Sequence, residues 1–251
     1  MAEALLAVEG LVKRFGGLVA TDRLSLAIPE GELHAVIGPN GAGKTTLIAQ
    51  LTGELASDAG TIRFAGEDVT RLPAHARVMR GLARSFQITS IFREFTTLDN
   101  AALAVQAHAG HSFRFWRKAR AETALRGPAA AVLAQVGLAA RAEVPAATLA
   151  HGEQRALEIA MALAARPRLL ILDEPMAGMG PEDSARMVEM LGQLKGRLTI
   201  LLVEHDMDAV FALADRITVL VYGRTIATGT PQAIRSNAEV RQAYLGEEVE
   251  P

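Results

Sequence analysis

The segment Gly38-Pro39-Asn40-Gly41-Ala42-Gly43-Lys44-Thr45-Thr46 decides the fold, because it satisfies the phosphate-binding pattern G-x-x-x-x-G-K-[ST]. The compact apolar run of residues 33–37 precedes it and is predicted to be a strand. A helix is predicted from Thr45 onward, with one apolar face made by Leu47, Ile48, Leu51 and Leu55. The order strand, loop, helix is the one that a phosphate-binding loop requires.

Each residue type in this loop has a chemical reason. Glycines let backbone N–H groups turn inward around a β-phosphate, and the N-terminus of the following helix adds partial positive charge. We expect Lys44 to reach the β- and γ-phosphates and the Thr45 hydroxyl to ligate Mg²⁺. The alternative, a glycine-rich turn that happens to precede a helix, is disfavoured by the flanking strand and helix.

Two adjacent carboxylates follow a second apolar strand, predicted over residues 169–172. A carboxylate at the end of a buried strand is costly unless something compensates it, so Asp173 and Glu174 suggest a cation nearby. Asp173 suits Mg²⁺, through a water, and Glu174 would polarise an attacking water molecule. An exposed pair of acids at a strand end is the alternative, and the phosphate loop argues against it.

Two further polar residues are weaker candidates when taken alone. His205 follows a predicted strand over residues 199–203, where an imidazole could contact a γ-phosphate, although a lone histidine is more often structural. Gln87 says little in isolation.

The C-terminal half alternates predicted helices with predicted strands, which favours a mostly parallel sheet covered on both faces. The predicted segments are helices 153–165, 182–195 and 207–214 and strands 169–172, 199–203 and 217–221. Ligands bind such sheets at the carboxyl ends of the strands. The first forty residues instead resemble strands joined by turns, and residues 88–149 resemble helices.

Composition narrows the class of protein further. A chain of 251 residues can bury one sizeable core, and a net charge of -2 gives no argument for a nucleic-acid partner. The absence of cysteine excludes disulfides, thiolate metal sites and a cysteine nucleophile. We see no secretory signal, and the apolar runs are too short to span a bilayer, so other subunits would have to hold the chain at a membrane.

Taken together, these segments resemble the ATP-binding cassette family over nearly the whole chain. Leu149-Ala150-His151-Gly152-Glu153-Gln154-Arg155 is similar to the LSGGQ signature of that family, just ahead of a helix. Gln87 falls at its Q-loop, where it would also ligate Mg²⁺, and His205 falls at its switch histidine. Phe15 lies at the position of the aromatic residue that stacks on adenine, with a core phenylalanine as the alternative.

The resemblance implies a single nucleotide-binding domain over residues 1–251. Its α/β core is RecA-like, with a mostly parallel sheet and an N-terminal antiparallel β-subdomain, and comprises residues 1–87 and 156–221. A helical subdomain would span residues 88–155, and a C-terminal extension would span residues 222–251.

The resemblance also implies the ligands and the partners. ATP and Mg²⁺ would bind between two cassettes in a head-to-tail dimer, in which Lys44 and Glu174 of one chain face the signature residues Ala150, His151, Gly152 and Glu153 of another. The second cassette would be a partner subunit or a copy of this chain. Transmembrane permease subunits, and indirectly a substrate-binding protein outside the membrane, would complete a transporter, with this chain peripheral on the cytoplasmic face of the inner membrane.

Several segments are similar in particular to the cassettes of branched-chain amino-acid importers: residues 83–87, 91–100, 151–160 and 222–247. Cassettes that export lipopolysaccharide or import urea share much of this pattern and stay open as alternatives. A soluble cassette ATPase usually carries two cassettes or coiled-coil arms, which this chain lacks. A regulator without catalysis is disfavoured because Glu174 is intact.

One residue departs from the family pattern, and one segment has more than one interpretation. Ala150 stands where the family usually has serine, whose hydroxyl reaches the γ-phosphate of the opposing ATP, so we predict slow hydrolysis at the site that this signature completes. The basic and aromatic residues 113–120 fit either an amphipathic helix with its basic side in solvent or a surface that meets the permease or lipid headgroups. Nucleic-acid binding fits them less well, because the chain as a whole is not basic.

Overall fold

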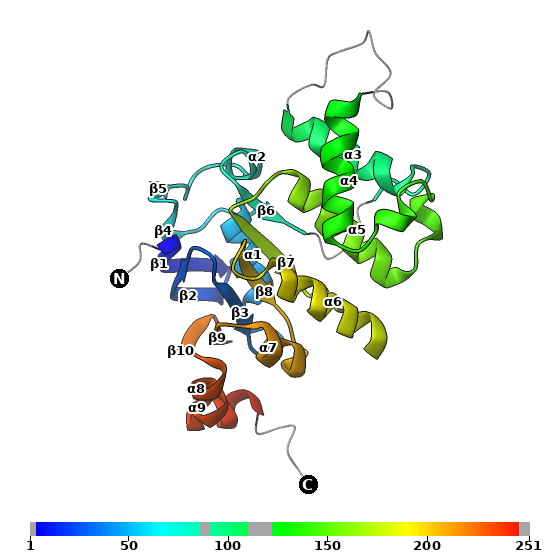
Figure 1. Cartoon of the computed structure of the whole chain (residues 1–251). Helices are drawn as coiled ribbons and strands as arrows, with labels where there is room; N and C mark the ends of the chain where they lie inside the picture. Colours follow the sequence, from blue (N-terminus) through cyan, green and yellow to red (C-terminus); the bar gives the residue numbers. More distant parts are fainter. Residues whose placement is uncertain (1–3, 86–90, 110–121, 246–251) are drawn as a thin grey trace.

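The computed structural model describes residues 4–85, 91–109 and 122–245, which form two sheets with helices around them (Figure 1). The first sheet is antiparallel, in the order β2-β1-β4-β5, with β1 Ala4–Phe15, β2 Leu18–Pro29, β4 Ala59–Phe64 and β5 Glu67–Asp68. The second has the order β10-β9-β3-β8-β7-β6, with β3 Leu33–Ile37, β6 Leu82–Arg84, β7 Leu169–Asp173, β8 Thr199–Val203, β9 Arg216–Val221 and β10 Arg224–Gly229. Five of these six strands are parallel and β10 pairs antiparallel at the edge, so the predicted fold class is confirmed.

Helix α1, Lys44–Thr52, is packed between the two sheets. Leu47, Ile48 and Leu51 are fully buried there against β1 and against one face of the parallel strands. The prediction that Leu55 extends this apolar face is wrong. Gly53 ends the helix at φ 79°, and its N–H donates to the carbonyl of Gln50, so the chain turns away before residue 55.

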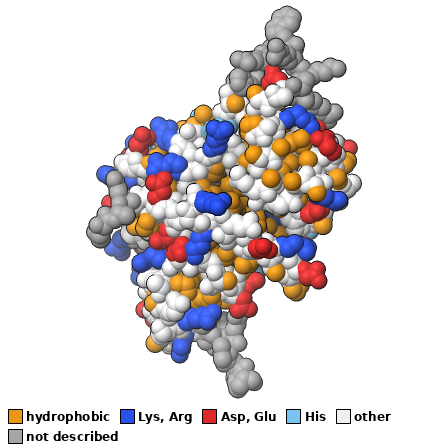
Figure 2. Space-filling view, in the orientation of Figure 1, with side chains coloured by type: hydrophobic (Ala, Val, Ile, Leu, Met, Phe, Trp, Pro, Cys, Tyr) orange, Lys and Arg blue, Asp and Glu red, His pale blue; other side chains and the backbone are white. Residues whose placement is uncertain are grey.

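The opposite face of the parallel sheet is covered by α5 His151–Ala164, α6 Pro181–Leu194 and α7 Met207–Leu213. Helices α3 Thr97–Ala109 and α4 Thr123–Gln135 pack on α5 and form a helical part that stands beside the sheets in Figure 1. The short helix α2 Ala74–Val78 lies next to β6. On the face of the molecule that Figure 2 shows, hydrophobic side chains lie in the middle, between the sheets and the helical part. Charged side chains are scattered around them.

The chain after β10 folds back on the core through α8 Pro231–Ser236, α9 Ala238–Val240 and a π-helical turn over Arg241–Leu245. Ile234 and Val240 are buried in the same core as α7. The Arg235 guanidinium lies over the Phe211 ring, 4.0 Å from its centroid, which adds a cation–π contact between α8 and α7. None of the helices in the described ranges is long and apolar enough to cross a membrane.

A chain of hydrogen-bonded polar side chains crosses β3, β9 and β10, and it is buried at His34 and Thr218. His34 is fully buried, with Nδ1 2.6 Å from Glu32 Oε1 and Nε2 2.8 Å from Thr218 Oγ1. Thr218 Oγ1 is in turn 2.8 Å from Thr228 Oγ1. Because β3 leads directly into the phosphate loop, this chain helps to fix the strand that carries the loop.

We predict that Thr218→Val lowers the free energy of unfolding by about 1–3 kcal/mol, because it leaves the buried Nε2 of His34 without its hydrogen-bond partner. The measurement is the urea unfolding midpoint. Thr225→Val on β10 is the matched control, since the Thr225 hydroxyl is buried without a hydrogen-bond partner among the described residues. Equal losses in the two variants would contradict the prediction.

Candidate functional site

The phosphate loop has a backbone that admits no side chain at its last glycine. Gly43 has φ 100°, and a Cβ built there would lie 2.2 Å from the carbonyl oxygen of Ala20. The turn between β9 and β10 holds the loop from the other side, because the N–H of Gly223 donates to the carbonyl of Ala42 at 2.9 Å. The loop is therefore a preformed concave backbone at the N-terminus of the nine-residue helix α1, as phosphate binding requires.

Lys44 begins α1 and folds back over the loop. Its ammonium donates to the carbonyls of Gly38, at 2.5 Å, and Pro39, at 3.1 Å. Burial lowers the pKa of Lys44, and the negative charges of Glu174 and Asp173 oppose that shift. The structure thus brings the lysine and the two strand-end acids into one electrostatic environment.

The remaining loop residues present backbone and hydroxyl groups at the surface of the same edge. Gly41, Asn40 and Thr45 are exposed, and Thr46 and Pro39 are half-buried. Because Thr45 is in the first turn of α1, its hydroxyl stands beside the helix N-terminus. Ala42 is buried against the core that surrounds α1.

Asp173 is the last residue of β7, and its carboxylate forms an ion pair with an arginine on the neighbouring strand. Its Oδ2 accepts from the guanidinium of Arg84, the last residue of β6, at 2.9 Å, and Arg84 also pairs with Glu54 at 2.7 Å. Burial raises the pKa of the Asp173 carboxyl, while Arg84 acts in the opposite direction. The compensating cation expected from the sequence is thus present in part as Arg84, which the sequence analysis did not single out.

Glu174 has an unusual backbone. Its φ is +49°, in the left-handed region that non-glycine residues rarely adopt, and its N–H donates to the carbonyl of Val203 at 2.8 Å. The parallel register Asp173↔Val203 therefore continues by one hydrogen bond beyond the strand. Strained backbone of this kind is concentrated at functional sites.

His205 follows β8 at the same edge, two residues after Val203. Its side chain is 62% exposed, so this histidine is not a core residue. Its Nδ1 lies 3.8 Å from the carboxylate of Glu204, whose own side chain is fully buried. The local sequence gives Glu204 no role, because nothing in its pattern shows that a glutamate after a strand turns inward.

Phe15 stands at the end of β1 and is 50% exposed, which excludes the alternative of a core phenylalanine. The Lys13 ammonium lies 5.6 Å from the centroid of its ring. An exposed ring face of this kind is available to stack on a planar ligand. Gln87 and the basic and aromatic residues 113–120 lie outside the described residues.

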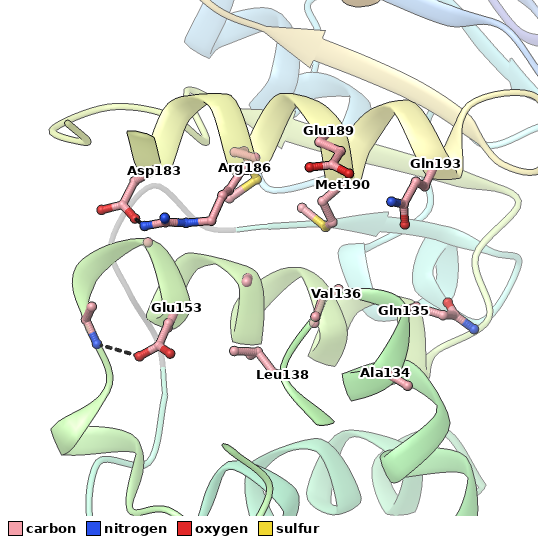
Figure 3. A pocket seen from close by; sticks show the side chains of 15 residues that line it. Ala134, Gln135, Val136, Leu138, Glu153, Asp183, Arg186, Glu189, Met190 and Gln193 are labelled. Carbon is pink, nitrogen blue, oxygen red and sulfur yellow. Dashed lines mark hydrogen bonds and ion pairs between the residues drawn. The ribbon is translucent and has the colours of Figure 1, made fainter. Parts of the chain in front are cut away.

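The signature residues Ala150 to Glu153 form the start of α5. Ala150 is its N-cap and exposed, and its N–H donates to the Glu153 carboxylate at 2.9 Å (Figure 3). Gly152 lies against α6, because a Cβ there would come within 2.9 Å of the Asp183 side chain. His151 is exposed, with Cε1 3.7 Å from the position that a Cβ on Gly178 would take.

A groove of about 520 Å³ lies beside the contact of Gly152 with α6, between α5, α6 and residues 134–138. Figure 3 shows Glu153 on one wall and Asp183, Arg186 and Glu189 on the other, with Arg186 turned toward Asp183. The signature segment thus has its contacts on α6 and, through the ion pair of Glu153 with Arg141, on the helical part.

The residues present fit a nucleoside triphosphate together with a hard cation such as Mg²⁺. The loop has no room for a Cβ at Gly38 or Gly43, and the oxygens of Thr45 and Asp173 are of the type that Mg²⁺ prefers. No group of three or more His, Cys, Asp or Glu side chains suited to a metal occurs in the part of the chain that the structure describes. A cation here would therefore take most of its ligands from phosphate and water.

Comparison with known proteins identifies the family. Residues 21–177 match the ABC transporter family, and residues 224–250 match the branched-chain amino acid ATP-binding cassette transporter family. The high-affinity branched-chain amino acid transport ATP-binding protein BraF of Pseudomonas aeruginosa is 41% identical, over 98% of this chain and 100% of its own length. LivG of Escherichia coli, a protein of the same description, is 40% identical over the same shares.

A solved structure agrees with these sequence matches. The crystal structure of the ADP conformation of an ATP-binding cassette of an ABC transporter superposes with a TM-score of 0.86 at 29% identity, covering 98% of this chain and 100% of that one. The family match alone spans more than half of the chain, and both relatives cover nearly all of it. The chain therefore belongs to the ABC transporter family, as one of its ATP-binding and ATP-hydrolysing cassettes.

Proposed function

We propose that this chain hydrolyses ATP to drive an importer of branched-chain amino acids. The observation that carries the substrate class is the match of residues 224–250 to the branched-chain type of cassette, because this segment lies beyond the general family match. The relatives BraF and LivG are both described as branched-chain amino acid transport ATP-binding proteins, and both match this chain over their full lengths. Import of urea and export of lipopolysaccharide are the alternatives that the experiment below must separate.

In the proposed site the loop residues 38–46 hold the phosphates, and Lys44 moves from the carbonyls of Gly38 and Pro39 to the β- and γ-phosphates. Glu174 orients and deprotonates the attacking water, and His205 contacts the γ-phosphate. Thr45, Asp173 and Gln87 are the proposed protein ligands of Mg²⁺, which supplies neutralisation of phosphate charge when bound. Phe15 is proposed to stack on the adenine ring.

The second half of the site is proposed to come from another cassette. Ala150 to Glu153 are at the N-terminus of the 14-residue helix α5, where backbone N–H groups favour an anion. Gly152 contacts α6 and Glu153 pairs with Arg141, and no hydrogen bond or ion pair in the described part of the chain joins these four residues to their own phosphate loop. Either a partner subunit or a copy of this chain would therefore present its signature residues to the ATP bound here.

We place the permease on an apolar groove of about 300 Å³ between the sheets and the helical part. Its walls come from α1, α2 and β6 on one side and from α3 and α5 on the other, including Val78, Ala104 and Met161. Arg84 also lines it, and Arg84 pairs with Asp173. A permease segment seated there would press on a residue that touches the hydrolytic site, at the cytoplasmic face of the inner membrane.

Uptake by intact cells tests the proposed function. We expect deletion of the gene to abolish uptake of radiolabelled leucine, isoleucine and valine, and the native gene to restore it. The control is a gene that carries Glu174→Gln. Its protein should be made normally but should not hydrolyse ATP. Normal leucine uptake together with lost urea uptake, or with lipopolysaccharide retained in the inner membrane, would replace the proposal by the corresponding alternative.

We predict that Ala150→Ser raises ATP turnover of the assembled transporter by about one order of magnitude. A hydrogen bond to a charged group contributes about 1.5–3 kcal/mol. If all of it is expressed in the transition state, the rate of hydrolysis changes by about 10- to 100-fold. A serine N-cap should also stabilise α5 by about 1 kcal/mol. Ala147→Ser, an exposed alanine just upstream, is the matched control, and a rise of less than threefold for Ala150→Ser would contradict the prediction.

A further inference from the structure

Glu204 is a buried carboxylate between β8 and His205 for which the proposed mechanism has no use. Its side chain is fully buried, although it lies one residue from the 62%-exposed His205. A glutamate is rarely buried unless several groups compensate its charge. Its burial therefore indicates that hydrogen bonds compensate both of its oxygens.

Those oxygens join two loops that leave neighbouring strands. Oε1 accepts from the N–H of Met176, in the turn after Glu174, at 2.9 Å. Oε2 accepts from the N–H of His205 at 3.1 Å, and the N–H of Asp206 also donates to this carboxylate. Burial raises the pKa of Glu204, and these backbone donors oppose the shift.

The link matters because no other hydrogen bond joins the two loops in the described part of the chain, although the Met176 side chain is also buried in the core. The last ladder contact between the two strands is the pairing of Asp173 with Val203, extended by the hydrogen bond from the Glu174 N–H. Beyond that point Met176 and His205 lie outside both strands and outside α6 and α7. Because the His205 ring is mostly in solvent, its position depends on its backbone rather than on packing.

We propose that Glu204 is a positioning residue that anchors the His205 backbone to the turn after Glu174, so that the histidine and the hydrolytic glutamate keep one relative position. This inference rests on the proposed role of His205. Only a carboxylate can do this, since it offers an acceptor to each loop. The amide of a glutamine has one acceptor, and its NH₂ group would face a backbone N–H.

The test compares Glu204→Gln, His205→Ala and the double variant in the full-length chain, with kcat, KM and ATP affinity measured for each. We expect Glu204→Gln to lower kcat about 10- to 100-fold while the Kd for ATP stays within twofold. In the His205→Ala background the same substitution should change kcat less than twofold, because its effect passes through the histidine. Glu67→Gln, an exposed glutamate on β5, is the matched control.

Three results would overturn the inference: a kcat for Glu204→Gln within twofold of wild type, a multiplicative loss in the double variant, or a parallel loss of ATP binding. If His205→Ala alone leaves kcat unchanged, the proposed role of His205 falls as well, so the two failures are distinguishable. Hydrogen exchange on the unmodified chain needs no variant to fold. The amides of Met176 and His205 should exchange about as slowly as those of β8, and exchange within seconds would count against the anchor.

Discussion

Replacing Glu174 by glutamine is expected to lower ATP turnover at least about 100-fold while ATP still binds. General base catalysis by a positioned carboxylate contributes about 10²–10⁴ in rate, and the amide of glutamine cannot take up the proton. The substitution keeps side-chain volume and the backbone hydrogen bond from residue 174 to Val203, so the fold should be unaffected. Turnover is measured by phosphate release, and binding by displacement of a fluorescent nucleotide.

The control for this substitution is Glu67→Gln, which removes a carboxylate that is 66% exposed on β5. It should leave both turnover and ATP affinity within twofold of wild type. A Glu174→Gln variant that retains more than a tenth of the wild-type kcat would show that another group activates the water.

The second large effect is expected for Gly43→Ala. A Cβ at this position lies 2.2 Å from the backbone oxygen of Ala20, and φ 100° adds strain for any residue that has a Cβ. We expect the free energy of unfolding to fall by about 3 kcal/mol or more, from overpacking and backbone strain together. The affinity for ATP should fall more than tenfold, because the loop can relieve the clash only by moving.

Gly41→Ala in the same loop separates the clash from the strain. Gly41 has φ 78°, but a Cβ there meets nothing within 4 Å, so the loss of stability should be limited to about 1–2 kcal/mol of left-handed backbone. Urea unfolding of the two variants measures the difference. Equal stabilities would mean that the contact with Ala20 carries no cost.

The sequence could predict those features whose cause is local. The strand over residues 199–203 has the predicted bounds, and the phosphate loop stands between a strand and a helix as its pattern demands. The end of α1 is also encoded locally, since Gly53 is a typical helix stop and ends the helix before the apolar spacing reaches Leu55. The fold class followed from these local patterns because alternating strands and helices leave few arrangements.

Arg84 and Glu204 could not be assigned in the same way. Arg84 meets Asp173 only because β6 and β7 are neighbours in the sheet, although 89 positions separate the two residues. Glu204 meets Met176 only because β7 and β8 are neighbours. Strand order is set by the packing of the whole domain, so a partner across two strands has no signature in either local segment.

The left-handed backbone of Glu174 also bears on how this protein can evolve or be engineered. A non-glycine residue at φ +49° lowers stability by about 1–2 kcal/mol, which glycine or asparagine at this position would partly recover. Directed evolution for heat resistance alone would therefore reward loss of the glutamate that we propose as the hydrolytic base. A library screened for stability should be screened for transport at the same time, or it will select cassettes that bind ATP and never release its energy.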